Sequence, residues 1–365
     1  ITTCLLILGL STAAMGMIDS NPIPCQNCTL HIFNISITAE YLTFLILHGF
    51  IASFATGGIS FVTVHTLLSK WFVKRRAMAN SISAAGASLG SVFFAPMSAY
   101  IVEIADWERG FLTLGMISLF VAMPLSALFM KEDPGDLLPE SEKIKSSSGN
   151  KDFEVVGPYF TKKISEAFRT PPFWQLSISY VVCGITTTMM GVHFVPFAED
   201  QGVSRVTAAT IFGFMMGVNL IGVLTAGAFA QRFQQKNVLG VVYAVRAMAY
   251  LLLIVIGGTA GLWIFAVVAG MSWLSTPAMT SSITADVYGL NNLGAINGLT
   301  NGAHQVGGAA AVLITGELYS LTGSYTLPFA LAGITLIVAT YFSFAVNENK
   351  YSYKFNPINQ KLATA

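Results

Sequence analysis

Three polar side chains recur on one face of a predicted helix at 293–318. Asn297, Asn301 and His304 follow each other at spacings that align them along that helix. Amide and imidazole groups are poor neighbours for lipid, so the stripe is expected to face protein or water. Imidazole also titrates near neutral pH, which suits proton transfer. We interpret the stripe as the lining of a polar pathway, with hydrogen bonding between helices as the alternative.

Further candidates lie on neighbouring predicted helices. His193, three residues before Pro196, serves either a proton pathway or gating and packing. Asn219 joins the polar set if the helix at 206–230 borders the same pathway. Trp273, in a helix bent by Pro277, either stacks on substrate or packs. Two more histidines are weaker candidates, His48 and His65.

Two charged residues bear on ion binding or switching. Arg246 is the basic residue that falls well inside a predicted span, where an uncompensated charge is costly. It either contacts an anion or acts as a charge switch, or it snorkels or binds helix carbonyls. Asp286 ends a helix on the predicted cytoplasmic side. It either pairs with a cation during a conformational cycle or is a solvated end charge.

A basic cluster opens the segment WFVKRRAMANSISAAGASLG, with Lys74, Arg75 and Arg76. These charges cannot enter hydrocarbon cheaply, so they mark the membrane surface and help to latch that face when it is closed. The helix that follows carries polar and small residues, which we assign to gating and close helix approach: Asn80, Gly86 and Gly90.

Composition places these elements in a membrane. Hydrophobic residues make up 54% of the 365 and charged residues only 10%, whereas soluble proteins carry about 25% charge. Crossing the hydrocarbon core as a helix takes roughly 20 apolar residues. We predict ten spans, at 1–18, 41–69, 78–102, 110–130, 173–197, 206–230, 238–257, 261–287, 293–318 and 326–346.

The distribution of basic residues gives an orientation. With loops assigned alternately to the two sides, 16 of the 19 Lys and Arg fall on one side, which the positive-inside rule makes cytoplasmic. We therefore expect a multi-pass protein of the plasma (inner) membrane with both termini cytoplasmic. The polar segment 131–172 is its cytoplasmic linker. The loop 19–40 faces outward with two glycosylation sequons, at Asn27 and Asn34.

Several kinds of chemistry are disfavoured. Cys25 and Cys28 form a CxxC pair without a following Cys or His pair, which favours an ordinary loop over a metal or redox site. The sequence has no recognisable nucleophile–base set, metal-ligand spacing or phosphate loop. We therefore expect no enzyme activity, no metal and no cofactor. A net charge of +1 gives no indication of nucleic-acid binding.

The two parts of the chain resemble each other. Asn80 and Gly90 are ten residues apart, and Asn297 and Gly307 repeat that spacing 217 residues later. Four spans precede the linker and six follow it. These features indicate a duplicated six-helix repeat, so we expect two helices of the first repeat to be missing upstream of Ile1.

On these grounds the sequence resembles the major facilitator superfamily, and is similar to its monocarboxylate-transporter-like and oxalate:formate-antiporter-like members. Three stretches carry the likeness: WFVKRRAMANSISAAGASLG, HFVPFAEDQGVSRVTAA and ADVYGLNNLGAINGLTNGAHQVGG. The resemblance implies an all-α membrane protein of two helical bundles, with ten of twelve spans present. It also implies alternating access around a midplane site. In that fold the helix of Arg246 is peripheral, which favours the snorkelling or carbonyl-binding role.

Departures from that family pattern bear on the substrate. Val223 stands where relatives place an anion-binding Arg, and Asn219 stands where some carry an Asp. Gln231 and Arg232 replace an acidic–basic pair, and His304 occupies the position of the antiporters' Lys. The resemblance therefore implies a charge-poor central site, which disfavours a dicarboxylate.

We predict a monomeric secondary transporter for a small organic solute. By resemblance the solute is a monocarboxylate-like anion, moved by proton symport or anion exchange. Its partners are that solute, a proton and the lipid bilayer. The alternative is an exporter of neutral or amphipathic compounds; a receptor without transport activity is a third and poorer fit. The expected domains are an N-terminal bundle (1–130), the linker (131–172), a six-helix bundle (173–346) and a tail (347–365).

Overall fold

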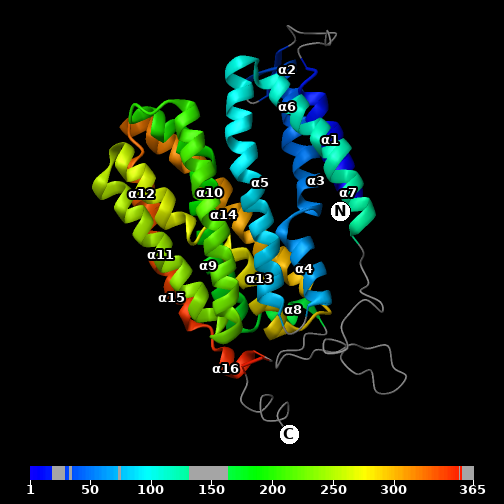
Figure 1. The fold of residues 1–365 in the computed structure, drawn as a ribbon, viewed down its shortest axis with the longest axis vertical. Helices are drawn as coiled ribbons and strands as arrows, with labels where there is room; N and C mark the ends of the chain where they lie inside the picture. The colour runs from blue at the N-terminus through cyan, green and yellow to red at the C-terminus, as the bar shows by residue number, and fades with distance from the viewer. Residues whose placement is uncertain (19–28, 33–34, 73–74, 131–162, 353, 356–365) are drawn as a thin grey trace. The chain divides into compact units, whose positions relative to one another are not determined.

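The structure is a computed structural model that describes residues 1–18, 29–32, 35–72, 75–130, 163–352 and 354–355 (Figure 1). Apart from turns and connecting loops, the described residues form helices and a short antiparallel hairpin of β1 (Thr29–Ile32) and β2 (Ile35–Thr38). This hairpin lies in the predicted outward loop, where no strand was expected. Five residues singled out above lie outside the described ranges, together with 131–162 of the linker: Cys25, Asn27, Cys28, Asn34 and Lys74.

The helices form two compact units, one made of residues 1–63 and 97–132 and the other of residues 64–96 and 133–365. Residues 64–96 thus group with the C-terminal helices, although the expected N-terminal bundle included them. The helix α5 (Arg76–Ile104) belongs to both units, because the boundary falls at Pro96 in its interior. The division into bundles at 1–130 and 173–346 stays a prediction.

The first unit packs through small residues. A Cβ added to Gly115 of α6 would lie 2.5 Å from the backbone nitrogen of Ala13 in α1, so the two helices touch backbone to backbone. Thr2 and Ser126 share a hydrogen bond of 2.9 Å. The helices of this unit are α1 (Thr2–Met15), α2 (Ala39–Phe44), the π-helix η1 (Leu45–Ala52), α3 (Ser53–Gly58), α6 (Trp107–Ile117), the π-helix η2 (Ser118–Ala122) and α7 (Met123–Phe129).

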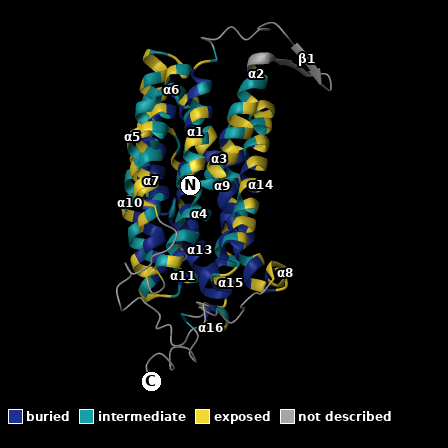
Figure 2. Cartoon of the chain, turned by 90° about the vertical axis from the view of Figure 1, so that its right-hand side faces the viewer, coloured by how far each residue is buried: buried dark blue, intermediate teal, exposed yellow. Residues whose placement is uncertain are grey.

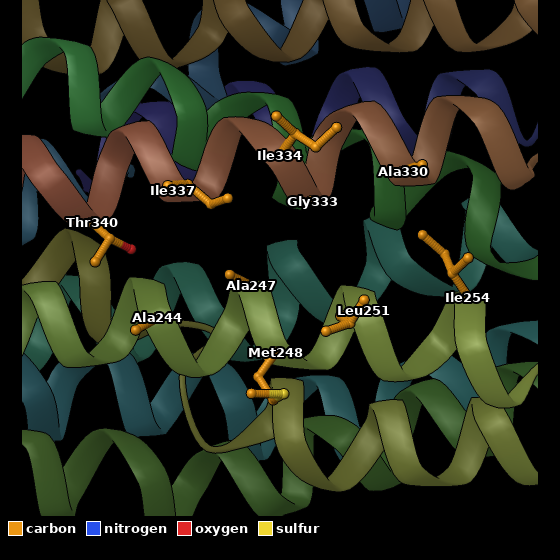
Figure 3. Close-up of a pocket in the computed structure, with 10 residues that line it drawn as sticks. All are labelled: Ala244, Ala247, Met248, Leu251, Ile254, Ala330, Gly333, Ile334, Ile337 and Thr340. Atoms are coloured by element: carbon orange, nitrogen blue, oxygen red, sulfur yellow. The ribbon is translucent and has the colours of Figure 1, made fainter.

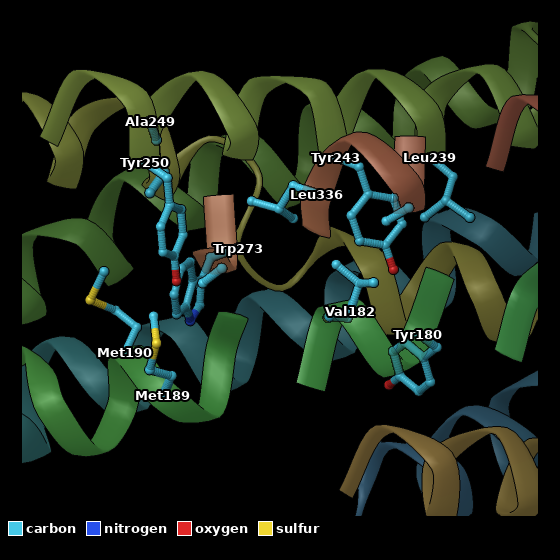
Figure 4. Packing of buried hydrophobic residues seen from close by; sticks show 14 of the residues in the cluster. Tyr180, Val182, Met189, Met190, Leu239, Tyr243, Ala249, Tyr250, Trp273 and Leu336 are labelled. Atoms are coloured by element: carbon cyan, nitrogen blue, oxygen red, sulfur yellow. The ribbon is translucent and has the colours of Figure 1, made fainter. Parts of the chain in front are cut away.

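The second unit holds the long helices and the buried core. Aromatic side chains from several helices meet inside it, among them Tyr180, Tyr243, Tyr250 and Trp273 (Figure 4). Its helices, besides the start of α5, are most of α4 (Phe61–Trp71), α8 (Ile164–Ala167), α9 (Pro171–Asp200), α10 (Arg205–Arg232), α11 (Gln235–Ile256), α12 (Gly258–Gly270), α13 (Ser275–Tyr288), α14 (Leu293–Thr322), α15 (Thr326–Ala345) and α16 (Glu348–Tyr351). In Figure 2 α13 is buried along its whole length.

Eight helical stretches in the described residues are long and apolar enough to cross a membrane. They correspond to eight of the ten predicted spans. The other two predictions fall on α1, which has only 14 residues, and on α14, which has 30 residues but is absent from that set. The all-α membrane class is therefore confirmed, while the count of ten spans stays a prediction.

The predicted repeat has a structural counterpart. Asn80 and Asn297 each lie four residues after the first residue of their helix, α5 or α14, and both are buried. Gly90 and Gly307 differ in their surroundings. A Cβ at Gly307 would lie 2.6 Å from the carbonyl oxygen of Val181, whereas one at Gly90 would meet only a side chain at 3.8 Å. The glycine contributes to close helix packing in α14 only.

Helices α9 and α14 pack closely against each other in the second unit. A Cβ on Gly184 would overlap the carbonyl group of His304, so glycine at this position lets α14 approach. One helical turn farther along the interface, a Cβ on Gly308 would overlap the side chain of Thr188. This contact fixes the position of His304.

We expect Gly184→Ala to destabilise the protein, because the new methyl group would push α14 away from α9. Alanine otherwise stabilises a helix by about 0.5–1 kcal/mol relative to glycine. A loss of stability in this variant would therefore be caused by the close contact between the two helices. The matched control is Gly191→Ala on the same helix, where a Cβ would meet no other atom within 4 Å. Thermal unfolding in detergent should show a lower midpoint for Gly184→Ala and an unchanged or higher midpoint for the control.

Candidate functional site

The second unit contains an interrupted helix. α12 ends at Gly270 and α13 begins at Ser275, so the turn Met271–Leu274 breaks a stretch that is otherwise long and apolar enough to cross the membrane. Helix ends leave carbonyl and amide groups without helical partners, and hydrocarbon offers no water to replace them. Protein side chains must therefore satisfy this turn.

Asn219 of α10 binds both sides of the break. Its Nδ2 donates to the carbonyl oxygen of Gly270 at 2.6 Å, and its Oδ1 accepts from the backbone nitrogen of Leu274 at 3.2 Å. The same Oδ1 accepts from Ser88 of α5 at 2.9 Å. Asn219, proposed as a substrate contact, is fully buried and committed to these three bonds.

Arg246 of α11 binds the centre of the break. Its Nη2 donates to the carbonyl oxygens of Ser272 and Trp273 at 2.7 and 2.6 Å. The guanidinium carbon also lies 5.2 Å from the centre of the Trp273 ring and 5.8 Å from that of Tyr243. Arg246 is fully buried, so it does not snorkel, and its interactions with the described residues involve carbonyls, a sulfur and aromatic rings, with no carboxylate. The site encloses a positive charge held by dipoles and aromatic faces.

A polar chain leads from this charge towards His304. Arg246 Nη1 lies 3.4 Å from Cys183 Sγ, which also contacts Thr276 Oγ1 at 3.0 Å. His304 lies beside Cys183, and its Nε2 lies 3.4 Å from Thr187 Oγ1. His304 is half-buried, so the chain connects an enclosed cation to a partly exposed imidazole.

The predicted stripe on α14 divides into residues with different environments. Asn297 is buried and donates to Ser281 Oγ at 2.8 Å, which is a bond between helices. Asn301 is half-buried, and His304 packs against the Tyr180 ring at 4.7 Å. His193 Nε2 lies 3.2 Å from the carbonyl oxygen of Val312. Asn297 therefore bonds between helices, whereas His304 belongs to the polar chain that leads to Arg246.

A second polar cluster joins α5 to the end of α13. Arg76 Nη1 lies 2.6 Å from Asp286 Oδ1, and both side chains are almost fully buried. Gln235 Nε2 donates to Asp286 Oδ2 at 2.7 Å. Each carboxylate oxygen therefore has its own donor, one from α5 and one from α11. Of the other predicted gating residues, Arg75 and Gly86 are exposed.

The chain after α15 completes this cluster with residues that the sequence analysis did not single out. Glu348 is fully buried and its Oε2 accepts from the backbone nitrogen of Lys236 at 2.9 Å. Lys354 Nζ donates to the carbonyl oxygen of Ala230 at 3.3 Å. Asn349 accepts from Gln234 at 2.6 Å. The signal available in the sequence was the presence of two charged residues, Glu348 and Lys354, soon after the last predicted span.

The apolar grooves of the second unit lie elsewhere. One of about 530 Å³ lies between α11 and α15, and its lining includes Met248 and Leu251 of α11 and Ile334 and Ile337 of α15 (Figure 3). A groove of about 600 Å³ lies along α9, α14 and α15. Neither is lined by His304, Arg246 or Asp286. These grooves lack the charges that a polar solute requires.

Comparison with known proteins identifies the family. The Major Facilitator Superfamily profile matches residues 1–312. The chain belongs to the major facilitator superfamily. It is therefore an integral, multi-pass membrane transporter, and this family consists of transporters rather than enzymes.

Individual relatives of this transporter are distant. Monocarboxylate transporter 12 of Rattus norvegicus is 26% identical over 361 residues, covering 90% of this chain and 73% of that protein. The uncharacterized MFS-type transporter YcxA of Bacillus subtilis is 27% identical over 287 residues, covering 75% and 66%. The crystal structure of the Escherichia coli fucose:proton symporter FucP matches with a TM-score of 0.59 at 13% identity, covering 94% and 83%. The last likeness concerns the fold.

We expect Arg246→Met to destabilise the transporter, because it leaves two carbonyls of the helix break without donors. A buried group that loses its partner costs about 1–3 kcal/mol. The control is Arg205→Met, whose ion pair with Glu199 is largely exposed and is worth about 0–1 kcal/mol. Thermal unfolding in detergent compares the two. Equal midpoints for the two variants would contradict the role of Arg246 in the break.

We expect docking of the segment after α15 to weaken as the pH rises from about 4.5 to about 7. Burial raises the pKa of Glu348 to about 7, against the opposing effect of the Lys236 amide. The folded state therefore binds this proton more tightly than the free chain, so the stabilisation is fully present below about pH 4.5, falls as the pH rises, and is lost above about pH 7. Hydrogen exchange of residues 346–352 measures docking. Glu348→Gln should abolish the pH dependence, and an unchanged profile in that variant would contradict this assignment.

Proposed function

We propose that this transporter moves a small monocarboxylate-like anion across the plasma membrane by alternating access. The observation that carries the proposal is the enclosed positive charge of Arg246, which lies at a helix break and contacts no carboxylate among the described residues. Such a charge favours a carboxylate nearby, because a buried cation gains most from an anion in low dielectric. The names of the monocarboxylate transporter 12 relatives agree with this class of substrate.

The position of that charge answers the difficulty raised by Val223. The resemblance places an anion-binding Arg at Val223 of α10, and the loss of that Arg implied a charge-poor site. Arg246 supplies a cation from α11 to the same break that Asn219 of α10 binds. The second unit therefore keeps a positive charge at this break, although the arginine stands on α11 and not on α10.

His304 is proposed as the group that couples transport to protons. It is half-buried and lies beside Cys183, whose sulfur accepts a hydrogen bond from Arg246 at 3.4 Å. An anion arriving beside Arg246 would favour the protonated imidazole, and a proton on His304 would favour the anion in turn. This reciprocal effect is what symport requires.

The Arg76–Asp286 pair is proposed as a latch of one conformational state. It connects α5 to α13 and lies at the helix ends that the basic residues predict to be cytoplasmic. Opening a path on that side requires α5 to leave α13, which breaks the pair. We assign the termini and the linker to the same side.

A second candidate function is export of neutral or amphipathic compounds. The observation that favours it is the full burial of Arg246, which leaves no face of its guanidinium exposed to a solute, together with an apolar Val223. Under this alternative Arg246 only stabilises the helix break. The substrate would then show no preference for a negative charge.

We expect proteoliposomes that contain the transporter to accumulate radiolabelled lactate, pyruvate or formate, and to do so faster when the outside is acidic. Transport is measured with and without a pH gradient and after addition of an uncoupler. Empty liposomes give the background. Uptake of none of the three acids would exclude the carboxylate proposal and leave the neutral-compound alternative.

We expect His304→Gln to abolish the stimulation of uptake by the pH gradient, because the imidazole is the proposed proton acceptor. Exchange of radiolabelled acid inside the proteoliposomes for unlabelled acid outside should persist, since the charge of Arg246 remains. The control is His193→Gln, whose imidazole lies near a backbone carbonyl and a tyrosine ring. Full stimulation in His304→Gln would assign the proton to another group.

A further inference from the structure

The segment after α15 folds back onto the ends of α10 and α11. Val346, Glu348 and Ser352 are fully buried there. Lys354 reaches the carbonyl oxygens of Ala230 and Gln231, in the last turn of α10, at 3.3 and 3.5 Å. The segment is thus an integral part of this end of the second unit.

The same end of the unit holds the buried carboxylate of Asp286. Gln235, which binds Asp286, lies four residues beyond Gln231, so Lys354 and Asp286 share one short stretch of neighbours. Lys354 lies within electrostatic range of Asp286, Glu348 and Arg76. The charged groups around Asp286 in the described residues are therefore Arg76 and Lys354 as cations and Glu348 as the anion, with Lys236 beside Glu348.

These cations stand on different parts of the chain. Arg76 belongs to α5, whereas Lys354, Gln235 and Asp286 belong to helices and the terminal segment beyond residue 163. Withdrawal of α5 would therefore remove Arg76 and leave Lys354 in place. Removing one partner of a buried ion pair is strongly unfavourable, because the remaining charge is left without compensation.

We propose that Lys354 is the positioning residue that neutralises Asp286 when Arg76 withdraws. The inference rests on the alternating access of the proposed function. A lysine suits this exchange because its ammonium group is a compact charge on a flexible stem that can reorient its three donors. While Arg76 occupies Asp286, the carbonyls at the C-terminal end of α10 hold the ammonium group, where a helix dipole favours a cation.

The competing role for Lys354 is to anchor the terminal segment through its two carbonyl bonds. The two roles predict opposite effects. A lost anchor loosens this end of the unit and makes opening easier. A lost replacement cation leaves Asp286 uncompensated in the open state and makes opening rarer.

The test measures opening directly in the purified full chain. Ser81 on α5 is fully buried, and Ser81→Cys places a thiol there that N-ethylmaleimide can reach only when α5 moves away. Labelling of the native cysteines in the parent chain is subtracted. Adding Lys354→Gln should slow the labelling of this thiol about tenfold, and Lys354→Arg should restore the rate. Lys350→Gln, which removes an exposed charge from the same segment, should leave the rate unchanged.

A second background separates the two roles. With Asp286→Asn in place there is no carboxylate to neutralise, so adding Lys354→Gln should then have no further effect. Faster labelling in Lys354→Gln, or the same slowing in both backgrounds, would overturn the proposal and leave the anchoring role. Labelling that occurs but does not respond to Lys354 would overturn this inference alone. A thiol that never reacts would overturn alternating access as well.

Discussion

The second unit depends on satisfying a broken helix inside hydrocarbon. The turn at Met271–Leu274 exposes backbone groups that lipid cannot bind, and side chains from two other helices supply the missing partners. Asn219 bridges the break and Arg246 caps its carbonyls. The break therefore fixes α10, α11 and the α12–α13 pair together. Close packing of α9 on α14 then positions His304 beside this centre.

Arg246 stabilises the architecture, and in the proposed function it also supplies the charge that attracts the anion. Arg246 stabilises the break only while it stays charged, and a guanidinium stays charged at every physiological pH. The positive charge at this site is therefore constant, and so is the attraction that we propose it has for an anion. Any response to pH must come from groups that titrate, and His304 is the partly exposed one on the polar chain that leads to Arg246.

Much of this fold could be predicted from the sequence, because a membrane helix must form all its backbone hydrogen bonds internally and is recognised by the length of its apolar segment. The sequence also indicated His304, Asn219 and Arg246 as residues of interest, since polar groups are costly in lipid. It could not give their partners. Val223 suggested a site without charge, because only the structure reveals that a cation on α11 reaches a turn next to α10. Glu348 and Lys354 were missed since a short polar tail gives no sign of burial until its contacts are known.

The helix α14 has a consequence for how the protein enters the membrane. It is absent from the eight helices that are apolar enough to span a bilayer, and it carries Asn297, Asn301 and His304. A segment of this kind gains little from leaving the insertion machinery for lipid alone. Its favourable surroundings are the small residues of α9, a helix made more than ninety residues earlier. Insertion of α14 is therefore cooperative: α9 must remain close to the exit site during synthesis until α14 can pack against it.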